Sequence, residues 1–262
     1  MTLDARALFY KKIVAKCIPD PTASVLVVGG GIRDMDVFRE LGFNNVVISN
    51  LDTRDSAERF LPYEWSYQDA ERLTFADNSF DYVVTHAALH HCHSPHRALL
   101  EMYRVSRFGA LSFESRDGWL MKLFERTNLT QVFEPTAVRY NDGKFGGVAN
   151  TEIPNFIYRW TEHEIEKTVN SFAPEYRHRI QYFYGNDTPA TPLLEKKGGA
   201  KRALIGLLSP IYQLFVMLAP KQQNLFAFMV PKPSGPAQLQ SWLKWEGDRP
   251  RFDMSWAENL YK

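Results

Sequence analysis

The sequence lacks the features that mark several classes of protein. Its two cysteines, Cys17 and Cys92, form no pair with metal or redox spacing, which excludes a disulfide scaffold and is typical of a reducing compartment. It has almost no net charge, with 31 Lys and Arg against 30 Asp and Glu, so charge gives no sign of a nucleic-acid partner. The amino terminus lacks the continuous apolar stretch of a signal peptide. We expect a cytoplasmic protein with a small or neutral partner.

Long apolar runs are also scarce. The longest, residues 203–220, is interrupted by Pro210, and its Ser, Tyr and Gln residues make it a poor membrane span. We expect an apolar helical segment at about 200–220, broken into two helices at Pro210. Three roles stay open for it: packing on the core, lining an apolar acceptor pocket, or peripheral contact with a membrane surface.

What the sequence does have is an alternation of short apolar runs with helical patterns. Strands are predicted at 25–28, 45–49, 81–85 and 110–115, and helical patterns occur at 35–41 and 96–106. Such alternation predicts an α/β fold, a parallel sheet with helices on both faces. Ligands of these sheets bind beyond the carboxyl ends of the strands, so the residues after each run are the candidates for a site.

Three glycines, Gly29, Gly30 and Gly31, follow the first run in the stretch SVLVVGGGIRD. A dinucleotide-binding turn reads G-x-G-x-x-G, and here Asp34 stands at the third glycine position. A carboxylate at the start of the next helix competes with a phosphate for the same backbone donors. A nicotinamide-dependent oxidoreductase is therefore the less favoured alternative.

Three stretches carry a family resemblance: VLVVGGG, QDAERLTFADNSFDYVVTHAALHH and SPHRALLEMYRVSRFGALSFES. Through them residues 24–116 resemble the class I S-adenosylmethionine-dependent methyltransferases. The first stretch matches the first motif of that family, the second its most specific block, and the third the helix, turn and strand that follow. The resemblance implies a Rossmann-like, seven-stranded, mostly parallel sheet with helices on both faces and an antiparallel last strand. In that fold the runs at 178–185 and 224–233 are the final antiparallel pair.

The resemblance also implies S-adenosyl-L-methionine as the cofactor and a set of residues that bind it. The glycine backbone would lie against the methionine portion, Asp69 and Ala70 would address the adenine, and Asn50 or Asp52 would hold the ribose hydroxyls. Histidines after the strand at 81–85 line or support the pocket in many family members. The predicted cofactor-binding residues are Gly29, Gly30, Gly31, Asn50, Asp52, Asp69, Ala70 and His86.

Three positions depart from the family pattern. Val27 stands where an acidic residue is common, Arg33 where a small residue is common, and Asn50 where the ribose carboxylate is expected. These departures keep a second hypothesis open, a binding protein that retains the fold without catalysis.

Catalytic candidates come from the strand ends nearest the expected methyl group. Transfer to oxygen or nitrogen requires removal of the acceptor's proton, and His90, His91 and Glu114 are the groups placed to assist it. The histidine-rich stretch 86–96 also invites a metal interpretation, but it has no cysteine or carboxylate at ligand spacing nearby. We therefore predict no metal.

The domain organisation expected is a class I methyltransferase domain over residues 1–233, followed by a tail at 234–262. An aromatic, turn-rich insertion at 117–160 would lie over the carboxyl ends of the strands and meet the acceptor. Thr161 to Glu164, TEHE, is a capping box that predicts a helix start. The function expected is methyl transfer to a small-molecule, sugar or lipid-linked acceptor, with oxygen as the favoured atom. The sequence leaves the oligomeric state open.

Overall fold

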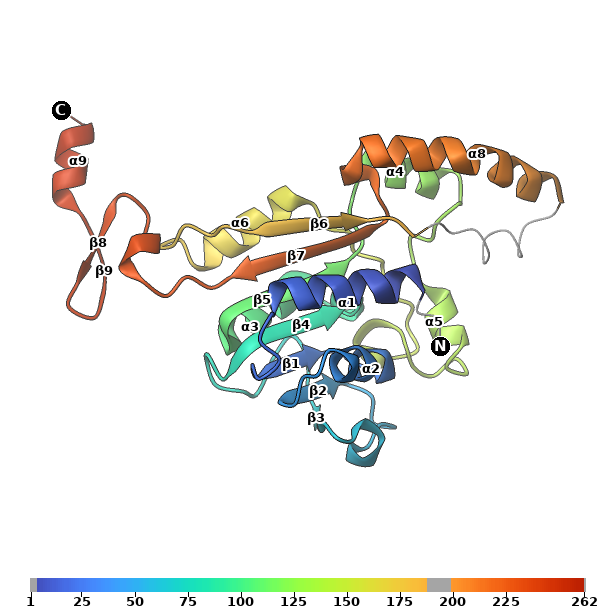
Figure 1. Ribbon diagram of the computed structural model, residues 1–262, viewed down its shortest axis with the longest axis horizontal. Helices are drawn as coiled ribbons and strands as arrows, with labels where there is room; N and C mark the ends of the chain where they lie inside the picture. Colours follow the sequence, from blue (N-terminus) through green and yellow to red (C-terminus); the bar gives the residue numbers. More distant parts are fainter. Residues whose placement is uncertain (1–3, 188–198, 262) are drawn as a thin grey trace.

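The computed structural model describes residues 4–187 and 199–261, and its centre is one seven-stranded sheet (Figure 1). The strand order is β3-β2-β1-β4-β5-β7-β6, and β7 runs antiparallel to both of its neighbours while the other pairs are parallel. This arrangement confirms the predicted fold class. The strands are β1 Val25–Val28, β2 Val46–Asn50, β3 Glu64–Tyr67, β4 Phe80–His86, β5 Ser106–Glu114, β6 Gln181–Gly185 and β7 Leu225–Pro231.

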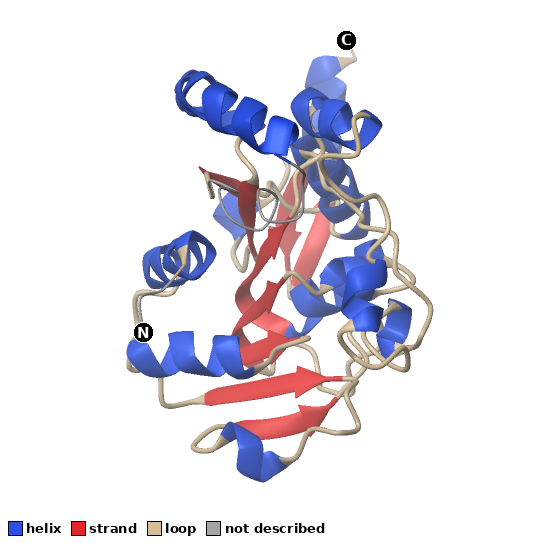
Figure 2. Ribbon diagram, turned by 90° about the vertical axis from the view of Figure 1, so that its right-hand side faces the viewer, coloured by secondary structure: helices blue, strands red, loops and turns tan. Residues whose placement is uncertain are grey.

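Helices cover both faces of the sheet and its carboxyl edge (Figure 2). The α-helices are α1 Ala5–Cys17, α2 Ile32–Glu40, α3 Pro95–Val105, α4 Trp119–Arg126, α5 Pro135–Arg139, α6 Glu162–Phe172, α8 Gly199–Leu218 and α9 Met254–Leu260. Short 3₁₀ turns are η1 Ala57–Phe60, η2 Leu89–His91, η3 Val148–Asn150, η4 Pro220–Gln222 and η5 Pro236–Gln238.

The alternation of side chains along β1 explains the two layers of core. Val25 and Val27 pack with α1 and α2 on one face, and Leu26 and Val28 pack with α3 and α6 on the other. All four are at most 1% exposed. A strand buried on both faces reads as a continuous apolar run, which is why the sequence identified β1 to the residue.

Within the seven-stranded sheet, the strand that sequence patterns missed is β3, Glu64–Tyr67. It lies at the edge of the sheet, pairs only with β2, and has no fully buried residue. Its sequence EWSY contains no β-branched aliphatic residue, so the periodic signal of a buried strand is absent.

The apolar segment near 200–220 corrects a prediction. The chain forms one helix, α8, with Pro210 inside it, rather than two helices broken there. A proline removes one backbone hydrogen bond from a helix, and the turns on either side keep theirs, so the helix continues. Among the described residues no helix is long and apolar enough to cross a bilayer.

The tail at 234–262 forms its own small unit at the amino-end side of the sheet (Figure 1). Strands β8 Leu243–Glu246 and β9 Arg249–Phe252 make an antiparallel hairpin that leads into α9. Trp256 of α9 contacts the rings of Trp242 and Phe252. The hairpin and α9 therefore project from the sheet, while Leu239, at 4% exposure, pairs with Tyr176 and joins the tail to the rest of the protein.

An ion pair fastens α6 to the end of β5 and yields a first prediction. Thr161 and Glu164 form the predicted capping box, and Glu162 accepts two hydrogen bonds from Arg116, at 3.0 and 2.8 Å, and one from Tyr184, at 2.6 Å. Burial alone would raise the pKa of Glu162, but the hydrogen bonds from Arg116 and Tyr184 offset it and lower the pKa to about 2.

Because the folded pKa of Glu162 is lowered, its contribution to stability is present above the ordinary glutamate value and is lost as pH falls toward 2. We expect Glu162→Gln to lower the free energy of unfolding at pH 7, and the difference from wild type to shrink on acidification below about pH 4.5. Urea unfolding across this range measures it. Glu258→Gln, an exposed site in α9, is the control; equal loss in both variants would contradict the assignment.

Candidate functional site

A cavity of about 580 Å³ lies at the carboxyl ends of β1, β2 and β4. Its volume is in the range that holds a nucleoside-sized molecule. Seven of the eight predicted cofactor-binding residues line it, from three separate segments of the chain: Gly29, Gly30, Gly31, Asn50, Asp52, Asp69 and Ala70.

The glycine turn after β1 has no room for side chains at two of its positions. Gly29 has φ +65°, and a Cβ there would lie 2.3 Å from the Cβ of Ala88. A Cβ on Gly30 would lie 2.7 Å from Cγ1 of Val27. At Gly31 a Cβ would meet nothing within 4 Å. The first two glycines are required by the fold, whereas Gly31 faces open space.

This contrast predicts different stabilities for two alanine variants. Gly30→Ala is expected to lower the free energy of unfolding by roughly 1–3 kcal/mol, because the added methyl overpacks a filled core site. Gly31→Ala is expected to change it by less than about 0.5 kcal/mol. Denaturant unfolding of both variants measures the difference, and equal values would contradict the geometry of the turn.

Asp34 occupies a backbone donor at the start of α2, as the sequence suggested. Its Oδ2 accepts a hydrogen bond of 2.8 Å from the Gly31 backbone N–H, and the side chain is buried at 5% exposure. The carboxylate thus uses a donor that a pyrophosphate would need in a dinucleotide fold.

The two ribose candidates after β2 differ in how they are engaged. The amide of Asn50 donates to the Gly30 carbonyl at 2.9 Å and to Asp55 at 2.8 Å, and its oxygen accepts from the Asp52 N–H at 2.8 Å. Asn50 therefore ties the glycine turn to the loop after β2. Asp52 pairs with Arg54 at 2.6 Å, and the hydrogen bonds from Arg54 hold the pKa of Asp52 below its ordinary value.

Asp69 and Ala70 form the opposite wall. One oxygen of Asp69, Oδ1, accepts the Glu71 backbone N–H at 2.9 Å, and the residue is exposed to the cavity. The preceding side chain, Gln68, is buried and bonds to Ser66 and Thr74. Gln68 anchors the segment, so Asp69 is held at the rim by a fixed backbone.

Residues of the insertion close part of the cavity. Asn141 accepts a hydrogen bond of 3.0 Å from Arg54, and Asn150 donates one of 3.2 Å to the carbonyl of Leu51. Arg54 also lies over the ring of Phe145, 4.4 Å from its centroid. Sequence reasoning did not single out Arg54, Asn141 or Asn150, because nothing in their spacing connects segments about ninety residues apart.

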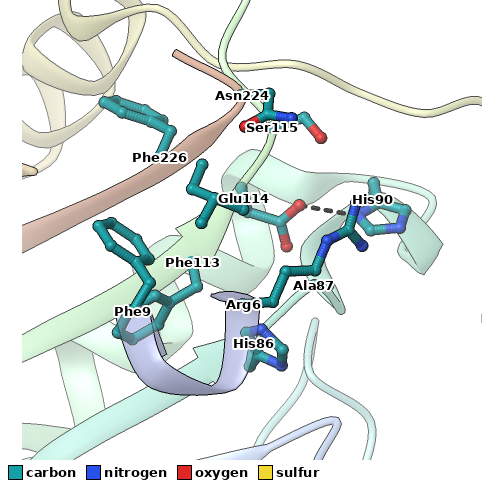
Figure 3. A pocket seen from close by; sticks show the side chains of 11 residues that line it. Arg6, Phe9, His86, Ala87, His90, Phe113, Glu114, Ser115, Asn224 and Phe226 are labelled. Atoms are coloured by element: carbon teal, nitrogen blue, oxygen red, sulfur yellow. Dashed lines mark hydrogen bonds and ion pairs between the residues drawn. The ribbon is translucent and has the colours of Figure 1, made fainter. Parts of the chain in front are cut away.

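His86 is the predicted cofactor residue that lies elsewhere. Its ring stacks on Tyr10 at 4.5 Å and lines a smaller cavity of about 80 Å³, on the α1 side of Ala87 (Figure 3). That volume is too small for a nucleoside. His86 does not line the larger cavity, because successive residues of a strand point to opposite faces, a detail that spacing alone left open.

The three catalytic candidates come together near Ala87. Glu114, at the end of β5, has a fully buried side chain that accepts from His90 Nδ1 at 2.7 Å and from the Leu89 N–H at 2.8 Å (Figure 3). His91 is the next residue of η2, with its ring centroid 4.6 Å from that of His90. His90 lines the smaller cavity and His91 the larger one.

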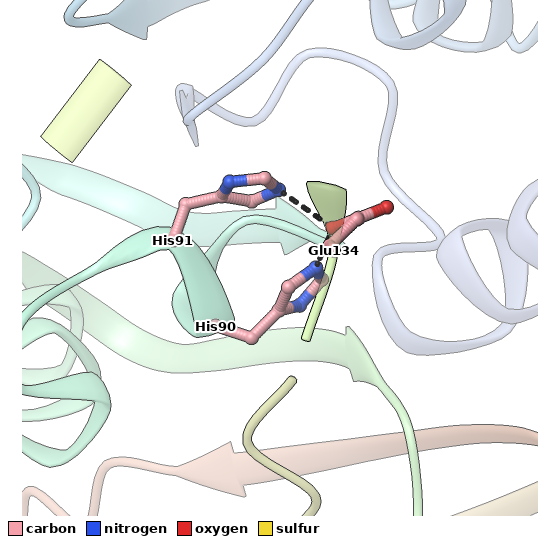
Figure 4. A group of neighbouring side chains, drawn as sticks. All are labelled: His90, His91 and Glu134. Carbon is pink, nitrogen blue, oxygen red and sulfur yellow. Dashed lines mark ion pairs between the residues drawn. The ribbon is translucent and has the colours of Figure 1, made fainter. Parts of the chain in front are cut away.

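Glu134, which sequence reasoning missed, completes this group from the insertion. Its Oε2 lies 3.5 Å from His90 Nε2 and 3.6 Å from His91 Nε2 (Figure 4). The prediction of no metal assumed that no carboxylate stood near the histidines. The structure overturns that assumption, because the loop before α5 returns over η2.

The electrostatics of the two histidines differ. Burial lowers the pKa of His90, but the carboxylates of Glu114 and Glu134 more than offset it and raise the pKa to about 10. Burial and the neighbouring His90 lower the pKa of His91. The charged ring of His90, 3.5 Å away, holds the pKa of Glu134 below its usual range.

Comparison with known proteins agrees with this geometry. Residues 39–113 match the family model described as a methyltransferase domain. No curated protein matches the chain.

Solved structures share the fold at low sequence identity. YcgJ from Bacillus subtilis is 14% identical, with a TM-score of 0.53, over 87% of this chain and 100% of that one. A chain from the complex of the Haloferax volcanii Trm112 methyltransferase activator with a methyltransferase is 13% identical, with a TM-score of 0.56, over 88% and 91%. The [4+2]-cyclase SpnF is 16% identical, with a TM-score of 0.50, over 87% and 82%.

The strand order is that of the class I S-adenosylmethionine-dependent methyltransferase fold, and residues 39–113 match a methyltransferase domain. The cyclase among the similar structures shows that this fold also supports other chemistry, so the reaction has to be argued from the site.

Proposed function

We propose that the protein binds S-adenosylmethionine in the larger cavity and transfers its methyl group to an acceptor oxygen. The observation that carries the proposal is the assembly of three distant segments, after β1, β2 and β3, around one cavity of about 580 Å³. Each segment supplies groups that suit one part of this cofactor.

Within the cavity we assign the parts of the cofactor as follows. The adenine amino group donates to Asp69, beside Ala70, and the methionine portion lies against the open side of Gly31. The ribose hydroxyls bind Asp52, since the side-chain groups of Asn50 are already bonded within the protein. Arg54 then shares Asp52 with the ribose.

The transfer itself balances simply. The acceptor oxygen attacks the methyl carbon, the carbon–sulfur bond breaks, and S-adenosylhomocysteine leaves as a neutral thioether. The acceptor must also lose a proton, and His91, which lines the larger cavity and whose pKa is lowered by burial and by the neighbouring His90, is the side chain suited to accept it. Glu114 accepts a hydrogen bond from His90 Nδ1 and acts as a positioning residue.

The acceptor class is suggested by an exposed apolar stripe on α8. Leu207, Ile211, Leu214 and Leu218 are each at least 60% exposed and follow helical spacing on one face. Trp119 and Leu123 of α4 are exposed as well, and α4 packs against α8 through Trp119 and Phe215. An apolar surface of this extent, rather than isolated residues, marks an interaction site.

Charge indicates which surface this stripe meets. Residues 199–223 contain Lys201, Arg202 and Lys221 and no acidic residue. Asn224, six residues after the end of α8, lines the smaller cavity, so α8 lies close to the site in the chain. We therefore propose that α8 rests on an anionic lipid surface and that the acceptor is lipid-linked, which brings the acceptor to the edge of the site.

Calorimetric titration of the purified protein tests the proposed cofactor. We expect micromolar binding of S-adenosylmethionine and S-adenosylhomocysteine and no binding of NAD, because Asp34 uses the donor that a pyrophosphate needs. Binding of both sulfur ligands without turnover of any acceptor would favour the non-catalytic alternative. Binding of NAD instead would overturn the proposal.

A further inference from the structure

Three side chains from η2 and from the loop before α5 place metal-binding atoms around one point. One ligand atom each from His90, His91 and Glu134 lies within 4.8 Å of the other two (Figure 4). Both histidines turn a ring nitrogen toward the same oxygen, Oε2 of Glu134.

The distances suit a shared ion better than hydrogen bonds. Separations of 3.5 and 3.6 Å exceed the roughly 2.7–2.9 Å of a charged N–H···O hydrogen bond. Two donors that each bind a divalent ion at about 2.1 Å, with tetrahedral angles, stand roughly 3.4–3.6 Å apart. Each imidazole is thus spaced from the carboxylate oxygen like a neighbouring ligand of one tetrahedral ion, and the ligand nitrogens of the two histidines lie within 4.8 Å of each other.

Outer contacts orient each of these ligands. His90 uses Nδ1 for the bond to the fully buried Glu114, which leaves Nε2 directed at Glu134. A ring nitrogen of His91 bonds the backbone of Gly147. Glu134 is held by Asn155, whose carbonyl accepts the Glu134 backbone N–H at 3.0 Å. A carboxylate behind a histidine is the usual support of a metal ligand.

We propose that His90, His91 and Glu134 form a binding site for a divalent transition ion, with zinc as the ion that this ligand set matches best. Three protein ligands of the His₂Glu type leave a fourth position for an oxygen ligand. The site lies between the two cavities, because His90 lines one and His91 the other.

The ion deepens the proposed function, and this part of the inference rests on it. With the ion bound, the histidine nitrogens are ligands and no longer accept the proton; an acceptor hydroxyl at the fourth position instead loses its proton to water more easily, since the ion stabilises the resulting alkoxide. The alkoxide oxygen then attacks the methyl carbon. Binding of the ion itself does not depend on methyl transfer.

Metal titration of the chelator-treated, full-length protein tests the site. We expect one equivalent of Zn²⁺ to bind, and Co²⁺ in its place to show the visible absorption of a tetrahedral complex. Glu134→Gln and His91→Ala are expected to weaken Zn²⁺ binding by at least about tenfold. His93→Ala, an exposed histidine outside the cluster, is expected to leave it unchanged.

Titration with S-adenosylhomocysteine in the same samples separates this inference from the proposed function. Cofactor binding without stoichiometric Zn²⁺ binding overturns the metal site and retains the proposed function. Zn²⁺ binding without cofactor binding retains the metal site and overturns the proposed function. Zn²⁺ binding that is unchanged in Glu134→Gln and in His91→Ala overturns the site. Thermal melting of Glu134→Gln, whose side chain is partly exposed, serves as the control for folding.

Discussion

Asp69→Ala is expected to reduce the affinity for S-adenosylmethionine by roughly ten- to a hundredfold. The variant removes a carboxylate at the rim of the larger cavity, the only acceptor that we assign to the adenine amino group. A hydrogen bond to a charged group contributes about 1.5–3 kcal/mol, which corresponds to that range of affinity. Calorimetric titration measures the change directly.

Two further variants make this result specific. Asp69→Asn keeps an acceptor oxygen and is expected to lose less affinity than Asp69→Ala. Asp248→Ala, in the exposed turn between β8 and β9, lies outside the cavity and is expected to bind like wild type. Unchanged affinity in Asp69→Ala would place the adenine elsewhere. Titration of the same samples with NAD tests whether the cavity binds a dinucleotide instead of S-adenosylmethionine.

Replacing Ile211 and Leu214 together by Glu is expected to abolish binding to anionic lipid vesicles. Both side chains are exposed, at 65% and 60%, on the apolar stripe of α8. Burying one such side chain contributes about 1.5–3 kcal/mol, and the new carboxylates are repelled by anionic lipid, so a loss of more than about a hundredfold follows. Cosedimentation with phosphatidylglycerol vesicles measures it, and phosphatidylcholine vesicles test the need for charge.

Leu260→Glu in α9 is the matched control, an exposed leucine far from α8 in the fold (Figure 1). It is expected to bind vesicles like wild type. A different outcome would identify the stripe as a contact between two copies of the chain. In that outcome wild-type protein does not sediment with vesicles, its molecular mass in solution rises with concentration, and the Ile211 and Leu214 double variant shows no such rise. That outcome would contradict the lipid surface.

Local patterns and the family resemblance were enough to identify most of the seven-stranded sheet and three of the segments that line the larger cavity. Buried parallel strands such as VLVV have a continuous apolar signal, and the turn that follows is specified by glycines that a Cβ would disrupt. The capping box at Thr161 is local too. Patterns were weaker where a segment is half-buried, as at β3, or where a single proline lies inside a long apolar helix, as at Pro210.

The sequence by itself determined the class of fold and the segments after β1, β2 and β3 that line the larger cavity. Only the tertiary structure decided which side chains remain free to bind a ligand, because that depends on hydrogen-bond and packing partners distant in the chain. It joined Asn50 to the glycine turn, turned His86 toward α1, and brought Glu134 to His90 and His91 across more than forty residues. Loop packing of this kind follows no sequence period, so no local pattern predicts it.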